Sequence, residues 1–391
     1  MLRKFLENKP VFYKKIDFER FPNAYAAVKP HLLLPRVIHI VGTNGKGSTG
    51  RFLAQILHSQ GLSVGHYTSP HIFDFNERFW RDGEVLSWEV LNACHERLLG
   101  FFEKQNAREL PLRLSYFEWA TLLAAVAFEG CDEVILEAGM GGEFDATNVF
   151  AKKMSVFTPI GLDHCEMLGE SLEQIATTKL NSLSPETLAV FTSDYALPQL
   201  GIDAALSKGV KPSFAPHTHF EAVSEFLKTR PLSDFLASNL NLAYFAARLL
   251  GREIAKIKFD FDLKGRCEKI APNLWVDVGH NPHAAKAVCE FVKQNLINLK
   301  VNLVYNAFKD KDFAEILRIF VPVINRVLVY DYESKDRELA SEEIFKTAQN
   351  LGVKCEKFHD ICSDENYIVF GSFMLVENFL RNFKQGFKIK V

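Results

Sequence analysis

The stretch Val37-Ile-His-Ile-Val41, followed by Gly42-Thr-Asn-Gly-Lys-Gly-Ser48-Thr49, decides the fold of this chain. Its first five residues are mostly β-branched and apolar, so they predict a buried strand that the glycines then end. Residues 51–60 carry apolar side chains on one helical face, and Gly61 suits the position that follows a helix. The stretch therefore predicts a strand, a glycine-rich turn and a helix.

A glycine-rich turn between a strand and a helix predicts an anion site, usually for a polyphosphate. Backbone N–H groups and the positive end of the helix dipole converge at such a turn. Lys46 adds a mobile positive charge, and Ser48 adds a hydroxyl within reach of a metal or a phosphate. The spacing departs from the common G-x-x-x-x-G-K-[ST] loop, because Gly47 stands between the lysine and the hydroxyl. An ordinary glycine-rich turn is the alternative.

Length and composition limit the class of protein. The 391 residues exceed a typical single core and predict two domains. Lys and Arg number 46 against 48 Asp and Glu, so the net charge of −2 does not mark a nucleic-acid binder. The first residues carry charges where a signal peptide is apolar, and no run approaches the ~18 apolar residues of a membrane span. Seven cysteines without a C-x-x-C pair favour a reducing compartment, so we expect a cytoplasmic monomer that binds neither nucleic acid nor a membrane.

Polar residues follow the next predicted strand, at residues 63–67. Pro70 cannot continue that strand as a central member of a sheet, so the chain turns there. In open parallel sheets, ligands bind at the C-terminal ends of strands, which makes Ser69 and His71 candidates. A plain turn at residues 68–71 is the alternative.

An acidic residue also stands at a strand end. Glu137 follows the apolar run at residues 134–136 and precedes three glycines in four residues. A carboxylate in this position suits a bound Mg²⁺, because a phosphate loop needs a metal ligand nearby. The alternative is a solvated glutamate beside a flexible turn.

One lysine is predicted to face inward. Ser171 and Gln174 form a plausible capping box, and the helix that follows places Lys179 on its apolar face. Snorkelling of the lysine stem at a boundary is the alternative.

The remaining pattern alternates strands and helices. In the first part we expect a strand at residues 154–160 and helices at residues 84–104, 116–128 and 239–250. In the last part we expect strands at residues 274–278, 301–305, 327–330 and 368–370, with helices up to about 295 and at 313–320 and 341–350. Repeated βα units predict a second, smaller parallel sheet. The predicted domains are residues 1–263 and 264–391.

Further motifs follow the glycine-rich turn in a fixed order along the chain. They are Glu137-Ala-Gly-Met-Gly-Gly-Glu-Phe-Asp-Ala-Thr-Asn148, Gly161-Leu-Asp-His-Cys-Glu-Met-Leu-Gly169 and Asp277-Val-Gly-His-Asn-Pro-His-Ala284. Together with the turn they closely resemble folylpolyglutamate synthase/dihydrofolate synthase, a branch of the Mur ligase superfamily. The resemblance covers nearly the whole chain. It implies an α/β fold, with a P-loop-type parallel-sheet ATP-binding domain and a smaller Rossmann-like C-terminal glutamate-ligase domain.

The resemblance implies an ATP-dependent ligase. Such an enzyme joins L-glutamate to dihydropteroate, to folates or to both. Phosphoryl transfer from ATP makes the pteroyl carboxylate an acyl phosphate, which the glutamate nitrogen then attacks. The implied cofactors are ATP and Mg²⁺, and the implied partners are small molecules, namely pteroate or folate, L-glutamate and ATP.

The resemblance also implies roles for individual residues. For ATP they are Thr43, Asn44, Gly45, Lys46, Gly47, Ser48, Asn241, Arg266 and Asp277. For the pteroyl substrate they are Ser69, His71, Tyr116, Phe117, Glu118, Phe144 and Asp145, and for Mg²⁺ they are Ser69, Glu137 and His164. The implied catalytic residues are Lys46, His280, Asp277 and Lys179, the last as a carbamate.

Three departures from the family pattern stand out, and one of them is Thr177-Thr-Lys-Leu-Asn181, which surrounds Lys179 in place of the usual Glu-Lys-Ala-Gly. Glu143 occupies a position where the family usually has arginine, and Leu236-Ala-Ser-Asn239 replaces the usual Gly-x-His-Gln. The alternatives are a Mur-type or other amino-acid ligase and, from a different class, a P-loop kinase or a nucleotide-gated binding module.

Overall fold

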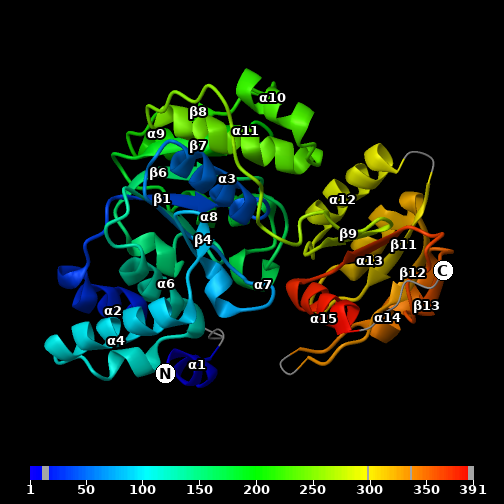
Figure 1. Cartoon of the computed structure of the whole chain (residues 1–391), viewed down its shortest axis with the longest axis horizontal. Coiled ribbons are helices and arrows are strands. Elements are labelled where there is room, and N and C mark those ends of the chain that lie inside the picture. The colour runs from blue at the N-terminus through cyan, green and yellow to red at the C-terminus, as the bar shows by residue number, and fades with distance from the viewer. Residues whose placement is uncertain (11–16, 297–298, 335–336, 386–391) are drawn as a thin grey trace. The chain divides into compact units, whose positions relative to one another are not determined.

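The chain folds into two compact units (Figure 1). A computed structural model describes residues 1–10, 17–296, 299–334 and 337–385. The first unit comprises Met1–Leu232 and Leu236–Phe261, and the second comprises Ser233–Phe235 and Asp262–Val391. The break after Phe261 lies close to the division that the sequence predicts between residues 263 and 264.

An eight-stranded sheet forms the centre of the first unit, in the order β4-β3-β2-β5-β1-β6-β7-β8. Six strands are parallel, and β3 and β4 add an antiparallel edge. β1 and β5 are buried along their whole length, as expected for parallel strands covered on both faces. The strands are β1 (Val37–Val41), β2 (Val64–Tyr67), β3 (Phe79–Arg81), β4 (Glu84–Val85), β5 (Glu133–Glu137), β6 (Lys152–Phe157), β7 (Leu188–Phe191) and β8 (Pro212–Phe214).

Helices cover both faces of this sheet. α2, α4 and α6 lie on one face, and α3 and α11 lie on the other (Figure 1). Burial of Trp119, Phe102 and Leu136 in one hydrophobic cluster holds α6 and α4 against β5. The helices are α1 (Leu2–Glu7), α2 (Arg20–Val28), α3 (Lys46–Ser59), α4 (Trp88–Lys104), α5 (Leu110–Arg113), α6 (Tyr116–Ala127), α7 (Cys165–Leu168), α8 (Leu172–Leu180), α9 (Pro198–Ser207), α10 (Glu221–Thr229) and α11 (Asp234–Leu249), with short η1 (Lys29–His31), η2 (Phe75–Arg78) and η3 (Ala146–Val149).

The first helix of the phosphate-loop motif starts earlier than predicted. The sequence predicts it over residues 51–60, whereas α3 begins at Lys46. Gly45, with a φ of 81°, makes the turn from β1 into the helix. Gly50 lies inside α3, where α3 packs closely against His66. A Cβ at this position would lie 2.5 Å from His66 Nε2, so a larger residue does not fit.

The predicted start of a second helix is also wrong. Residues 84–104 were predicted as one helix, but Glu84–Val85 form β4, and α4 begins only at Trp88. Asp82 and Gly83 have φ angles of 51° and 103°, so the chain reverses there and pairs β4 with β3. The side chain of Ser87 then caps α4.

The second unit contains a six-stranded sheet in the order β13-β12-β11-β14-β10-β9. Only β9 runs antiparallel to its neighbour, so the second parallel-type sheet and the α/β fold class are confirmed. Its elements are β9 (Glu268–Ala271), β10 (Leu274–Asp277), α12 (Pro282–Asn295), β11 (Val301–Tyr305), α13 (Phe313–Phe320), η4 (Val321–Val323), β12 (Ile324–Val329), α14 (Ser341–Asn350), β13 (Lys354–Lys357), β14 (Tyr367–Phe370) and α15 (Phe373–Gln385).

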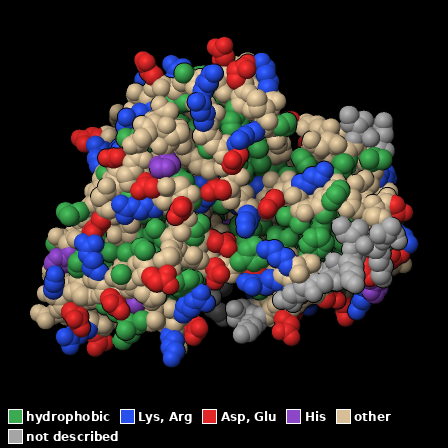
Figure 2. All heavy atoms as spheres, in the orientation of Figure 1, with side chains coloured by type: hydrophobic (Ala, Val, Ile, Leu, Met, Phe, Trp, Pro, Cys, Tyr) green, Lys and Arg blue, Asp and Glu red, His purple; other side chains and the backbone are tan. Residues whose placement is uncertain are grey.

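The surface carries both signs of charge. Lys and Arg side chains are interspersed with Asp and Glu over the face in Figure 2, which does not resemble the single basic stripe of a nucleic-acid binder. Within the described ranges, no helix has the length and apolar character needed to span a membrane. The seven cysteines, all of them described, form no disulfide.

Candidate active site

The glycine-rich turn at residues 42–45 joins β1 to α3 and is held by the segment that follows β6. Thr43 N donates to Pro159 O over 3.0 Å. The Thr43 hydroxyl donates to Gly161 O over 3.0 Å and accepts from Gly161 N over 3.1 Å. The N-cap residue of α3 is Gly45, which has no side chain to cap the first turn, so the leading N–H groups of the helix suit an anion.

Lys46 lies across this turn. Its Nζ donates to Gly42 O over 3.2 Å and to Thr43 O over 3.1 Å. Gly45 leaves no space for a side chain, because a Cβ would lie 2.7 Å from Asn239 Oδ1. The turn therefore presents backbone donors and one ammonium group, which is the chemistry that polyphosphates require.

Asn239 of α11 is a site residue that the sequence did not indicate. Its Nδ2 donates to Ser48 Oγ over 2.9 Å, and both side chains are buried. The one sequence signal was its place at the end of Leu236-Ala-Ser-Asn239, where the family pattern is replaced.

Glu137 and Ser69 meet at adjacent strand ends. β2 and β5 pair in parallel with Tyr67 opposite Leu136, so the residues that follow emerge side by side. The Glu137 carboxylate is only 4% exposed, and its Oε2 accepts from Ser69 N over 3.0 Å and from the Thr68 hydroxyl. Thr68 is a second residue that sequence reasoning missed.

His164 is placed differently from these two residues. It lies after β6 with a φ of 53°, and its side chain is 44% exposed, with Nε2 4.0 Å from Asp163 Oδ1. Within the described ranges, no three His, Cys, Asp or Glu side chains gather as a metal site. A carboxylate and a serine hydroxyl are hard oxygen donors, so they fit Mg²⁺, which commonly takes few protein ligands beside phosphate and water oxygens.

Lys179 points into the protein, as predicted, and contacts the phosphate turn. The side chain is 3% exposed, and its Nζ donates to Gly42 O over 3.0 Å. Burial, followed by the charge of Lys46, lowers the pKa of Lys179 from 10.5 to about 7, against the opposing effect of Asp163 and Asp145. About half of the Lys179 side chains therefore carry a neutral amine beside the turn at pH 7.

The turn that follows Glu137 packs directly on α8. A Cβ on Gly142 would lie 2.9 Å from Lys179 Cα, and Glu143 N donates to Thr178 O over 2.9 Å. The Glu143 carboxylate, which replaces the family arginine, accepts from Asn181 Nδ2 over 2.8 Å. Close packing of this turn therefore fixes Lys179 relative to Glu137.

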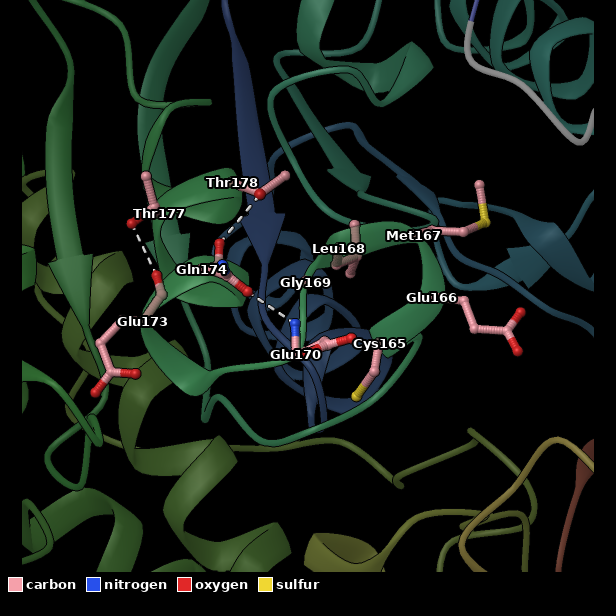
Figure 3. Close-up of a pocket in the computed structure, with 10 residues that line it drawn as sticks. All are labelled: Cys165, Glu166, Met167, Leu168, Gly169, Glu170, Glu173, Gln174, Thr177 and Thr178. Carbon is pink, nitrogen blue, oxygen red and sulfur yellow. Dashed lines mark hydrogen bonds between the residues drawn. The ribbon is translucent and has the colours of Figure 1, made fainter.

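Residues of α7, of α8 and of the segment that joins them line a hollow (Figure 3). Residues 165–170, 173–174 and 177–178 line it. The Thr177 and Thr178 hydroxyls bond back to the carbonyl oxygens of Glu173 and Gln174 over 2.8 and 3.1 Å. Glu166, Glu170 and Glu173 all border the hollow, so like charges disfavour an anionic phosphate or carboxylate there.

Two of the predicted pteroyl-side residues share one arginine. Arg78 Nε donates to His71 Nδ1 over 2.9 Å, and the Arg78 guanidinium lies 5.2 Å from the centre of the Tyr116 ring. Burial, helped by the charge of Arg78, lowers the pKa of His71 to about 3, so His71 is neutral near pH 7. Glu118 is instead paired with Arg20, which lies 98 residues away, with donor distances of 2.9 to 3.2 Å.

Two other predicted pteroyl-side residues, Asp145 and Phe117, contact the turn that follows Glu137. Asp145 is buried, and its Oδ2 accepts from Gly139 N over 2.9 Å. Burial raises the pKa of this carboxyl, against the hydrogen bonds it accepts. Phe117 packs on the same glycine, where a Cβ would lie 2.6 Å from its ring. Phe144 instead is exposed and forms an edge-to-face pair with Phe18, with ring centres 4.8 Å apart.

The second unit gathers three predicted residues at the end of β10. Asp277 is buried, its Oδ2 accepts from Cys267 N over 2.9 Å, and its Oδ1 accepts from Gly279 N over 2.8 Å. Burial raises the pKa of Asp277, and the charge of Arg266 opposes this. His280 follows in the same turn. Asp277 and Arg266 are therefore close enough to interact, and Nδ1 of His280 lies 3.3 Å from Val278 O.

Asn241 of the first unit uses its amide locally. Its Oδ1 accepts from Phe220 N over 3.1 Å, and its Nδ2 donates to Pro216 O over 3.0 Å. The structure thus gives it backbone partners before α10, and its assignment to adenine stays a prediction.

Known proteins share the fold and much of the sequence. A crystal structure of Helicobacter pylori folylpolyglutamate synthetase superposes with a TM-score of 0.77, at 37% identity, and covers 98% of each chain. Escherichia coli FolC in complex with DHPP and ADP gives a TM-score of 0.82 at 27% identity, over 98% of this chain and 96% of that one. No family model matches the chain.

A curated relative establishes the family. The dihydrofolate synthase/folylpolyglutamate synthase of Escherichia coli is 33% identical over 310 residues, which are 74% of this chain and 72% of that protein. This identity agrees with the superposition on the folylpolyglutamate synthetase of Helicobacter pylori, which covers 98% of the chain. The chain therefore belongs to the dihydrofolate synthase/folylpolyglutamate synthase family of ATP-dependent ligases.

Proposed function

We propose that this chain forms an amide between the amino group of L-glutamate and a carboxylate of dihydropteroate, of a folate or of both, while ATP becomes ADP and phosphate. The observation that carries the proposal is the meeting of an anion-binding turn, Lys46 and the buried Glu137 at neighbouring strand ends of one sheet. The related FolC complex with DHPP and ADP supports it. The Mur-type ligase, kinase and binding-module alternatives gain no support from these relatives.

The first step activates the carboxylate. A carboxylate oxygen of the dihydropteroate or folate attacks the γ-phosphorus of ATP, and the bond from that phosphorus to the bridging oxygen breaks, which gives an acyl phosphate and ADP. The turn at residues 43–48 holds the phosphates, and Lys46 stabilises the charge that develops. Bound Mg²⁺ would neutralise phosphate charge, and Ser69, Glu137 and His164 are the residues proposed to hold it.

The second step forms the amide. The amino nitrogen of glutamate attacks the acyl carbon, the C–O bond to phosphate breaks, and the nitrogen loses a proton. We assign Arg266 and Asp277 to the nucleotide, with Asn241, and His280 beside them. We also propose that the protein acts as a monomer in the cytoplasm.

The pteroyl group is proposed to bind beside the turn after Glu137. His71, Tyr116 and Phe117 supply ring surfaces, and Asp145 and Glu118 supply carboxylates nearby, with Phe144 at the exposed side. Because His71 has a pKa of about 3, it would contribute a neutral imidazole and no positive charge near pH 7. Ring surfaces beside a small number of polar groups suit a flat heterocycle.

ADP release is expected to require both a pteroyl acceptor and glutamate, because the acyl phosphate is productive only when its nucleophile is present. The test supplies ATP, Mg²⁺ and glutamate with dihydropteroate or tetrahydrofolate in parallel reactions. ADP is followed with time and the products are identified by mass. Omission of glutamate or of the acceptor serves as the control, and rapid ATP hydrolysis that ignores both would contradict a ligase.

A further inference from the structure

Ser48 is the hydroxyl of the phosphate turn, and its hydrogen bonds can be counted. A serine hydroxyl has one hydrogen to donate and two lone pairs that accept. Ser48 Oγ donates to Gly45 O over 3.2 Å. Asn239 Nδ2 donates to Ser48 Oγ over 2.9 Å and thereby uses one lone pair. Ser48 Oγ therefore keeps one lone pair for a further partner, and it has no hydrogen left to donate.

This count determines which ligand the hydroxyl can meet. Phosphate oxygens are acceptors and need a donor, whereas a hard cation needs a lone pair. Ser48 is 1% exposed and Asn239 is 4% exposed, so bulk water does not compete at either group. With its hydrogen directed to Gly45, Ser48 suits Mg²⁺ and does not suit a phosphate oxygen.

We propose that Asn239 is a positioning residue that orients the Ser48 hydroxyl so that Ser48 ligates the Mg²⁺ of the bound nucleotide. Asn239 lies on α11, 191 residues from Ser48 in the chain, and does not itself bind the metal. Its Oδ1 lies against Gly45, so the amide is held on the turn from both ends. The inference rests on the proposed function for the presence of Mg²⁺ with ATP.

The role comes from a departure in this sequence. Asn239 ends the segment Leu236-Ala-Ser-Asn239, which stands where the resembled family has Gly-x-His-Gln. Glutamine carries the same amide on a stem that is one methylene longer. The Asn239→Gln change therefore keeps a donor for Ser48 and serves as the conservative variant.

The test measures the affinity for ADP by calorimetry, with and without Mg²⁺. In the unaltered protein Mg²⁺ is expected to tighten ADP binding. In Asn239→Leu and Asn239→Ala this Mg²⁺-dependent gain is expected to fall by about 10- to 100-fold, as is usual when a residue that orients a metal ligand is removed. The gain is the ratio of the ADP affinities with and without Mg²⁺, and Asn239→Gln is expected to keep most of it.

Tyr244→Phe is the matched control. Tyr244 is buried on the same helix, and its hydroxyl donates to Ile254 O over 2.8 Å, away from the turn. Its loss is expected to lower the melting temperature without changing the Mg²⁺-dependent gain. If Asn239→Leu and Asn239→Ala retain the same gain as Tyr244→Phe, the inference is overturned.

A double-mutant cycle with Ser48→Ala gives a second, independent test. Because Asn239 acts through Ser48, adding Asn239→Leu to Ser48→Ala is expected to cause no further loss of the gain. Two losses that simply add would overturn the inference. The readout uses only ADP and Mg²⁺, so a protein that binds both normally but forms no amide would contradict the proposed reaction and leave this inference standing.

Discussion

Glu137→Gln is expected to raise the Mg²⁺ concentration for half-maximal ADP release by about 10- to 100-fold and to reduce turnover sharply. Glu137 ends β5, is 4% exposed, and accepts through Oε2 from Ser69 N and the Thr68 hydroxyl. Glutamine retains one oxygen for these two donors, so the strand ends keep their contacts. The negative charge that a hard dication prefers is lost.

The measurement is ADP release at several Mg²⁺ concentrations, together with a melting curve. Glu133→Gln is the matched control, because Glu133 lies at the opposite end of β5, is also 4% exposed, and pairs with Lys153 Nζ at 2.5 Å. That variant is expected to melt at a lower temperature with the same Mg²⁺ dependence. An unchanged Mg²⁺ titration for Glu137→Gln would remove Glu137 from the proposed metal site.

Buried parallel strands were the part of the fold that the sequence specified best. β1 and β11 have the bounds that were predicted, because each is a short apolar run of parallel-sheet type. α13 and α14 also match at both ends, each with an apolar face of helical period. Local patterns therefore specify elements whose burial follows directly from their own residues.

Elements between residues 184 and 219 were harder to predict. The sequence there has proline-punctuated pieces, but Pro198 begins α9. Proline at the first helical position keeps the helix, since the N–H that it lacks has no partner there. From the neighbouring residues alone, Pro198 could equally end a helix or strand, so tertiary context decides between a loop and the start of a helix.

The sequence predicted the motif residues of the site but not the side chains that contact them. Gly45, Lys46 and Glu137 stand out because their types and spacing imply chemistry. The partners of these residues do not stand out. Asn239 reaches Ser48 from 191 residues away, so only the packing of α11 beside the phosphate turn brings them together.

Lys179 is expected to act as a carbamate. The neutral amine attacks the carbon of CO₂, an N–C bond forms, and a proton is released to leave an anion. A pKa of about 7 leaves about half of the amine neutral at pH 7, whereas the ordinary 10.5 leaves roughly one part in 3,000. The charge of Lys46, which helps to lower that pKa, also favours the carbamate anion.

This chemistry predicts a dependence on pH. Below pH 7 the ammonium form prevails, so activity in CO₂-depleted buffer is expected to fall, and added bicarbonate is expected to restore part of it. The sign for stability follows from the same shift. Because the pKa is lowered on folding, the cost of burying the ammonium is present in full below about pH 7 and disappears as the pH rises through 10.5.

Lys179→Ala is expected to lose most activity while remaining folded, and acetate is expected to restore part of it by occupying the vacated space. Lys179→Arg keeps the positive charge but forms no carbamate, so it should fail as badly. Lys152→Ala is the control, since Lys152 is equally buried, with a pKa lowered to about 8, and its Nζ donates to Asn148 O. That control is expected to lose stability and keep its response to bicarbonate.

The direct observation is a carbamate carbon signal after incubation with ¹³C-labelled bicarbonate. The signal is expected in the unaltered protein and in Lys152→Ala, and it is expected to be absent from both Lys179 variants. Its strength should follow the neutral fraction of an amine with a pKa of about 7. An arginine variant with near-native turnover would exclude the carbamate and leave Lys179 as a structural lysine whose amine only holds the carbonyl oxygen of Gly42.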